Sequence, residues 1–197
     1  MQINSFNNLN FQKKLVATAH IGDSYNPQSV EIYHMDKESD FDELKEKFSA
    51  NEWEDAFYSK RIMHFFKKDC NQDRYYVIEA GDEIINYADT YHDEDSDAVV
   101  INFLETAPKY AKDSGHDRLF KYAGETMLSF LAKVAQESDI SKIKLEYRDV
   151  KSTRDFYFSQ CGFLPAGVNR AVLYKHRFND LIEQNEYHTG NNINLLT

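Results

Sequence analysis

Residues 98–108 read AVVINFLETAP, and the part up to Leu104 is apolar on both alternating sets of positions, apart from Asn102. A strand with this pattern is covered on both of its faces, so we predict a central strand of a sheet at 98–104. The strand meets a proline at residue 108. This stretch is the best candidate for the centre of the core, and the remaining elements are arranged around it.

Weaker patterns on either side complete the expected order of elements. Alternation or helical spacing of apolar residues predicts strands at 28–35, 74–79, 83–90, 142–148 and 171–178, and helices at 40–48, 51–68, 124–135 and 152–160. This order implies one α/β (α+β) domain over 1–178, with a mixed sheet and helices on both faces. We expect residues 1–28 to form an N-terminal extension and residues 179–197 to form a polar tail with a short helix.

Composition excludes several classes of protein. The chain has 197 residues, 42% of them hydrophobic, with 7 Gly and 3 Pro, which is typical of a packed globular protein. The formal charge of -10 would repel nucleic-acid phosphates and an anionic membrane surface, so neither is an expected partner. No apolar run is long enough to span a bilayer, and the first residues lack the order of a secretory signal, so we expect a cytoplasmic protein.

Cysteine and histidine carry little signal for a disulfide framework or a metal. Two cysteines, Cys70 and Cys161, are too few for such a framework, and each is expected to be a packing residue. The seven histidines lack the spacing of paired metal ligands, so no metal is expected.

Two motifs resemble those of the GNAT superfamily of acyl-CoA N-acyltransferases. In that family a strand ends shortly before a proline, and the next helix opens with Arg/Gln-x-x-Gly-x-Gly/Ala; here residues 121–126 read KYAGET. Residues 157–163, YFSQCGF, resemble the family's Phe-Tyr-Glu-Lys-x-Gly-Phe signature. The resemblance implies the GNAT fold, with a mixed, mostly antiparallel central sheet. It also implies transfer of an acetyl group from acetyl-CoA to an amine.

The resemblance further implies how acetyl-CoA would be held. Backbone N–H groups at the start of a helix converge on the pyrophosphate, and a glycine lets the chain approach it closely. Strand N–H groups near Leu104 and Thr106 would polarise the thioester carbonyl. The helix residues assigned to the cofactor in this way are Lys121, Tyr122, Ala123, Gly124, Glu125 and Thr126. Thr126 departs from the family pattern, which has Gly or Ala at that position.

Two residues are candidates for proton transfer. Glu105, at the end of the central strand, would take a proton from the acceptor amine, although a structural or substrate-orienting carboxylate is an equal alternative. Many family members protonate the departing thiolate with a tyrosine at the position of Phe158. Tyr157 is one residue away, turned by about 100° if the segment is an α-helix, so it is either the acid or a packing residue.

Other functions stay open at this stage. A catalytically silent GNAT-fold module that binds acyl-CoA or a protein partner would explain Phe158, and an unrelated α/β interaction protein would match the motifs by chance. The acceptor is a small-molecule or peptide amine, and a homodimer is a further option that the resemblance raises.

Charge along the chain suggests what the acceptor carries. Residues 36–55 have a net charge of -6 and residues 79–97 a net charge of -8, whereas residues 107–122 sum to +2. We hypothesise that the acidic segments steer a cationic amine and that the basic segment faces the anionic cofactor. Charge that serves only solubility is the alternative.

Overall fold

The computed structural model describes residues 13–22, 24–35, 47, 73–107, 110 and 120–196. The predicted helices at 40–48 and 51–68 lie outside these residues, apart from Lys47. Cys70 and most of the basic segment at 107–122 also lie outside them. None of the helices in the described part has the length and apolar character that a membrane span requires.

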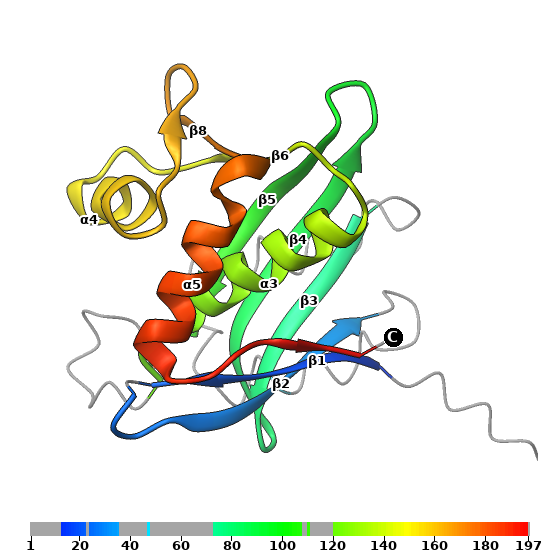
Figure 1. Cartoon of the computed structure of the whole chain (residues 1–197), viewed down its shortest axis with the longest axis vertical. Coiled ribbons are helices and arrows are strands. Elements are labelled where there is room, and N and C mark those ends of the chain that lie inside the picture. The colour runs from blue at the N-terminus through cyan, green and yellow to red at the C-terminus, as the bar shows by residue number, and fades with distance from the viewer. Residues whose placement is uncertain are drawn as a thin grey trace, which may run out of the picture.

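The described residues form one twisted sheet of nine strands in the order β7-β8-β6-β5-β4-β3-β2-β1-β9 (Figure 1). The pairing is antiparallel except between β5 and β6, which are parallel. This confirms the expected mixed, mostly antiparallel sheet. The strands are β1 (Lys14–Ile21), β2 (Gln28–Met35), β3 (Asp73–Ala80), β4 (Glu83–Asp93), β5 (Ala98–Thr106), β6 (Lys142–Glu146), β7 (Leu164–Pro165), β8 (Arg170–Tyr174) and β9 (Asn194–Leu195).

Two helices cover one face of this sheet, α3 (Ala123–Glu137) and α5 (Phe178–Thr189) (Figure 1). Helix α3 links β5 to β6 and buries its apolar stripe, with Met127, Leu128, Leu131 and Ala135 each at most 1% exposed. The remaining segments are short: α4 (Lys151–Arg154), the π-helix η2 (Asp155–Gln160) and the 3₁₀-helix η3 (Lys175–Arg177). A second buried cluster, which includes Tyr75 and Val77, lies on the opposite face of the sheet.

The structure differs from the expectation at both ends of the domain. The expected N-terminal extension, 1–28, contains β1, which pairs with β2 and is a full strand of the sheet. The expected polar tail, 179–197, contains most of α5 and all of β9, and β9 pairs with β1. Phe178, Leu181 and Ile182 of α5 are buried in the main core. The described parts of both terminal segments therefore belong to the folded domain.

The chain opens a gap where β5 and β6 part. The two strands are paired only from Ala98 to Ile101 and from Lys142 to Leu145. Beyond that point β5 runs on to Thr106, whereas β6 ends at Glu146 and leads into α4. Asn102 is an extra residue between two pairings with β4, and such a β-bulge bends a strand and re-aims its side chains. Among the described strands, the second half of β5 therefore has a neighbour on one side only.

Candidate active site

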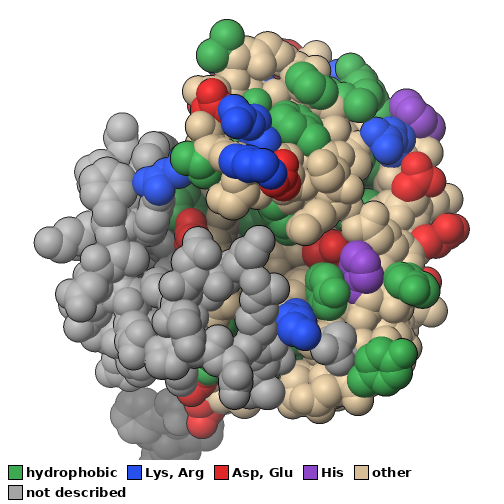
Figure 2. Space-filling view, turned by 90° about the vertical axis from the view of Figure 1, so that its left-hand side faces the viewer, with side chains coloured by type: hydrophobic (Ala, Val, Ile, Leu, Met, Phe, Trp, Pro, Cys, Tyr) green, Lys and Arg blue, Asp and Glu red, His purple; other side chains and the backbone are tan. Residues whose placement is uncertain are grey.

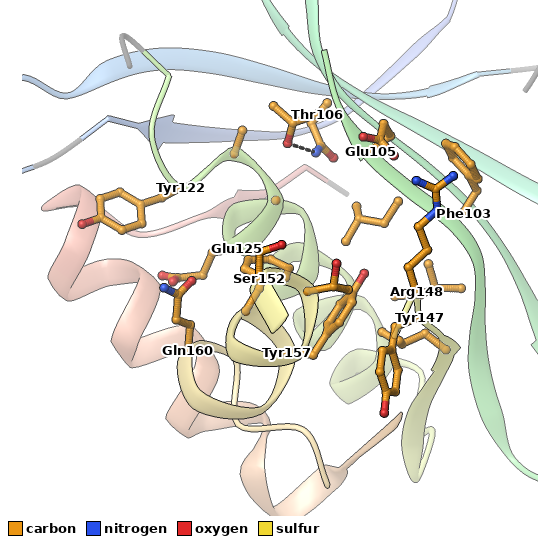
Figure 3. A pocket seen from close by; sticks show the side chains of 18 of the residues that line it. Phe103, Glu105, Thr106, Tyr122, Glu125, Tyr147, Arg148, Ser152, Tyr157 and Gln160 are labelled. Carbon is orange, nitrogen blue, oxygen red and sulfur yellow. Dashed lines mark hydrogen bonds between the residues drawn. The ribbon is translucent and has the colours of Figure 1, made fainter. Parts of the chain in front are cut away.

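A cleft of about 790 Å³ fills the gap beside the free side of β5. Its walls come from the end of β5, the turn before α3 with the first residues of α3, the segment after β6, and η2 (Figure 3). The space-filling view shows the hollow with basic side chains on its upper rim and a histidine beside hydrophobic side chains below it (Figure 2). Backbone groups of β5 that would bind a further strand border this cleft.

The end of β5 brings a half-buried acid to the cleft. Burial raises the pKa of Glu105 to about 7, and removal from water is the cause of the shift. Near neutral pH this carboxyl therefore exists in both forms, as a general base requires. Next to it, Thr106 is fixed by a 3.1 Å hydrogen bond from Asn86 Nδ2 to its hydroxyl. Leu104, Glu105 and Thr106 all line the cleft, as the resemblance implies.

The start of α3 presents the opposite end of the cleft. Tyr122 precedes the helix in the left-handed conformation (φ 67°, ψ 9°). The first N–H groups of a helix have no intrahelical acceptor, so those of Ala123, Gly124 and Glu125 are available to an anion. A Cβ added at Gly124 would lie 3.2 Å from Phe156 Cζ, so this position has little room for a side chain. These residues and Lys121 line the cleft.

Thr126 corrects the expected set of cofactor-binding residues. Its N–H already donates to the carbonyl of Tyr122 at 2.8 Å, and its side chain is fully buried. Its hydroxyl accepts a 3.0 Å bond from Asn185 Nδ2 of α5 and is absent from the cleft wall. A branched side chain is tolerated here because the side chain faces α5 and does not face the anion site.

Glu125 lines the cleft with part of its surface, but its carboxylate points to α5. His188 Nδ1 lies 2.9 Å from its Oε1. Gln184 donates to Oε2 at 3.3 Å and Asn185 to Oε1 at 3.5 Å. These partners give hydrogen bonds to both oxygens of a carboxylate that is only 2% exposed.

The tyrosine of the YFSQCGF motif lies in the cleft wall, and Phe158 does not. The Tyr157 hydroxyl points into the cleft (Figure 3), whereas Phe158 packs edge-on against Tyr147 at 5.3 Å. Adjacent residues still point in different directions, but the segment is a π-helix, and its wider turn directs Tyr157 to the cleft in place of Phe158. Burial raises the pKa of the Tyr157 hydroxyl, and charge on Cys161 and Glu105 raises it further.

Cys161 lies behind this wall as a packing residue. It is 2% exposed, and burial raises the pKa of its thiol. A thiol that stays protonated is a poor nucleophile.

Several cleft residues escape sequence reasoning. Phe103, Tyr147 and Arg148 gather at the same end as Glu105, whereas Tyr122 and Gln160 lie at the other end (Figure 3). Tyr147 and Arg148 were expected inside a strand, yet β6 ends at Glu146. No local pattern marks the point at which two parallel strands part, so these residues carried no signal.

The acidic residues of the segment 79–97 lie in different parts of the fold. Glu79 is buried and bonds Lys13 at 2.5 Å and Lys47 at 2.9 Å, so its charge is already paired. The acidic residues 93–97 precede β5, whereas Glu105 is near its end, roughly 20 Å away along an extended strand. This part of the segment is too far from the cleft to face an acceptor there.

Solved structures share this fold. No protein-family model matches the sequence, and no curated protein sequence matches it. A protein from Desulfovibrio desulfuricans assigned to the GNAT acetyltransferase family superposes with a TM-score of 0.54 at 9% identity, covering 74% of this chain and 99% of that one. The ribosomal-protein-S18-alanine N-acetyltransferase of Escherichia coli gives 0.54 at 12% identity, covering 74% and 93%.

A third neighbour was solved with coenzyme A. The PaiA N-acetyltransferase of Thermoplasma acidophilum, in complex with coenzyme A, gives a TM-score of 0.51 at 15% identity, covering 75% of this chain and 99% of that chain. At these identities the likeness concerns the fold. The chain has the GNAT acyltransferase fold, as the sequence motifs imply.

Proposed function

We propose that this protein is an N-acetyltransferase that moves the acetyl group of acetyl-CoA to an amine by direct attack. The observation that carries the proposal is that the start of α3 and the Glu105 carboxyl, with a pKa of about 7, line one cleft beside the side of β5 that no described strand covers. The start of α3 would bind the phosphates of acetyl-CoA. The Glu105 carboxyl would accept a proton from the amine.

The residues present fit coenzyme A as a substrate. The N–H groups of Ala123, Gly124 and Glu125 would hold the pyrophosphate, and the lack of a side chain at Gly124 lets Phe156 of the cleft wall pack closely against the start of α3. The free edge of β5 near Leu104 and Thr106 offers backbone groups to the extended part of the molecule. When bound, acetyl-CoA supplies an acetyl group that its thioester activates toward amines.

Glu105 is proposed to act as the base. As a carboxylate it takes one proton from the attacking amine, directly or through one water, while the new C–N bond forms and the C–S bond breaks. Backbone N–H groups of β5 stabilise the negative charge that develops on the carbonyl oxygen. A neutral amine loses one proton to Glu105, and the released thiolate takes up one proton to become the thiol. The numbers of protons on the two sides of the reaction are therefore equal.

Tyr157 is proposed to assist the departing sulfur. Because its pKa is raised, the hydroxyl stays protonated through the neutral range and can donate a hydrogen bond to the thiolate. Its place in the cleft wall supports the enzyme over the silent module, because a tyrosine hydroxyl is present there although position 158 is a phenylalanine.

The acceptor is proposed to be a small-molecule or peptide amine, and a cationic one remains our hypothesis. Glu105, the aromatic residues Phe103 and Tyr147, and the cationic Arg148 lie together at the end of the cleft where the acceptor would bind (Figure 3). If charge steers the acceptor, its KM should rise with ionic strength. A KM that is insensitive to salt would reject the steering hypothesis and leave the rest of the proposal standing.

Two measurements test the function. Calorimetry should detect binding of acetyl-CoA, and thiol release should then depend on an added amine from a panel of amino acids, polyamines and peptide N-termini. Failure to bind acetyl-CoA would reject both the enzyme and the silent module. Binding without turnover on any amine would favour the silent module.

A further inference from the structure

The outer end of the cleft is formed by an aromatic side chain on a constrained backbone. Tyr122 has φ 67°, a region that non-glycine residues seldom adopt. Its ring lies nearly parallel to the imidazole of His188 on α5, with 4.5 Å between ring centroids and 14° between planes. Among the labelled residues in Figure 3, Tyr122 lies far from Phe103 and Arg148, which mark the other end.

The imidazole behind this ring is itself held in place. His188 Nδ1 lies 2.9 Å from the Glu125 carboxylate, which is buried and bonded by two further α5 side chains. The turn before α3 is thus tied to the last turn of α5 through Tyr122, His188 and Glu125. The tyrosine ring is therefore oriented before any ligand arrives, and its ordering costs little on binding.

The position of this ring defines what it would meet. Tyr122 directly precedes the three N–H groups proposed to hold the pyrophosphate, and the reacting end of the substrate points the other way, toward Glu105. The part of the molecule beyond its phosphates must therefore leave the cleft past Tyr122. In coenzyme A that part is an adenosine, and a purine gains free energy by stacking on an aromatic face.

We propose that the face of Tyr122 turned away from His188 binds the adenine ring of the substrate's nucleotide end. The inference rests on the proposed function and adds a second binding site to it. The site would favour ligands with a flat base after the pyrophosphate over ligands that end at the phosphate.

The test compares two ligands on four proteins. Calorimetry gives Kd for coenzyme A and for 4′-phosphopantetheine, which lacks the 3′-phosphoadenosine and one of the two bridging phosphates, with the unchanged protein, Tyr122→Asn, Tyr122→Phe and Tyr174→Asn. Asparagine tolerates the left-handed conformation but has no ring. Tyr174 is the matched control, since it too lies parallel to a histidine (6.0 Å, 12° to His176) but is outside the cleft wall.

We expect Tyr122→Asn to weaken coenzyme A roughly tenfold and to leave phosphopantetheine unchanged. Tyr122→Phe and Tyr174→Asn should leave both values within about twofold. No binding of coenzyme A to the unchanged protein would reject the proposed function itself. Equal weakening of both ligands by Tyr122→Asn, or no weakening of either, would overturn this inference alone.

A second measurement needs no variant. Coenzyme A with a fluorescent ethenoadenine base should lose fluorescence when it binds the unchanged protein, because a stacked aromatic ring quenches the base. Binding without any loss of fluorescence would overturn the stacking site, even if Tyr122→Asn failed to fold.

Discussion

The N–H of Cys161 donates to the carbonyl oxygen of Phe156 at 2.9 Å, a bond that spans five residues where an α-helix spans four. This wider turn rotates the residues that follow Phe156 relative to an α-helical path. As a result Tyr157 lines the cleft and Phe158 packs on Tyr147. The inverted order of the two aromatic residues is compensated by the backbone.

Tyr157→Phe is therefore expected to lower kcat for acetyl transfer roughly 10- to 100-fold, the value of one hydrogen bond to a charged group. KM for acetyl-CoA should change little, because the ring remains. The control is the double variant Tyr157→Phe with Phe158→Tyr, which restores the family's usual order. Since position 158 faces away from the cleft, the double variant should not regain activity, and full recovery would contradict the π-helical placement.

The pH dependence of kcat/KM should report Glu105. With a pKa of about 7, the carboxyl becomes an active base as pH rises through that value, so the rate should rise about tenfold per pH unit below it. Glu105→Gln should remove this inflection and lower the plateau. The pH profile should be measured with several amine acceptors of different pKa. An inflection caused by Glu105 keeps its position with all of them, whereas one caused by the acceptor shifts with the acceptor's pKa. An inflection that follows the acceptor and survives Glu105→Gln would reject Glu105 as the base.

The same burial makes Glu105 a cost to stability at higher pH. Its pKa is raised from 4.5, the value expected in the unfolded chain, to about 7 in the folded protein. As pH rises, the unfolded chain therefore loses this proton at a lower pH than the folded protein does. The free energy of unfolding therefore falls as pH rises between these values, by on the order of 2–3 kcal/mol. Glu105→Gln should stabilise the protein at pH 8 and leave it nearly unchanged at pH 4 in urea unfolding. The exposed Glu183→Gln should show no such pH-dependent gain.

Gly124→Ala should separate binding from stability. Alanine favours a helix by up to about 1 kcal/mol over glycine, which opposes the strain of the added contact, so the net change in the free energy of unfolding should be small. Its Cβ would press on Phe156 Cζ at 3.2 Å in the cleft wall, and Kd for coenzyme A should rise several-fold by calorimetry. Unchanged affinity in a stable variant would argue that the phosphates lie elsewhere.

The centre of the fold was predictable from local patterns. β5 is apolar on both alternations because both of its faces are covered, and α3 repeats apolar residues at helical spacing. Glu105 and Gly124 could be predicted as site residues because Glu105 is near the end of β5 and Gly124 is near the start of α3. The orientation of Tyr157 and the neighbours of Glu125 depend on a π-helical turn and on α5, which no single stretch of sequence specifies.

The short helix expected in the C-terminal segment is present as α5, but its burial was not expected because part of its buried face is polar. α5 reads FNDLIEQNEYHT, with few large apolar residues, yet Asn185 and Thr189 are at most 1% exposed. Asn185 bonds Thr126 and Glu125, and Thr189 bonds the carbonyl of Asn185. Buried polar groups require such partners. The partners of Asn185 are on α3, 59 and 60 residues earlier in the chain, and the two hydrogen bonds are 3.0 and 3.5 Å long.

Helix α5 is therefore expected to carry part of the stability of the whole domain. Phe178 is fully buried at the start of this helix, so Phe178→Ala should lower the free energy of unfolding by about 3–5 kcal/mol, from lost burial and the cavity left behind. The matched control is Tyr187→Ala on the same helix, where the ring is 82% exposed and the change should stay within about 0.5 kcal/mol. Urea unfolding followed by circular dichroism measures both. If the segment after residue 178 were a loosely attached tail, the two variants would unfold at the same urea concentration as the unchanged protein. A large shift for Phe178→Ala alone would place α5 within the cooperative core that supports the Glu125 side of the cleft.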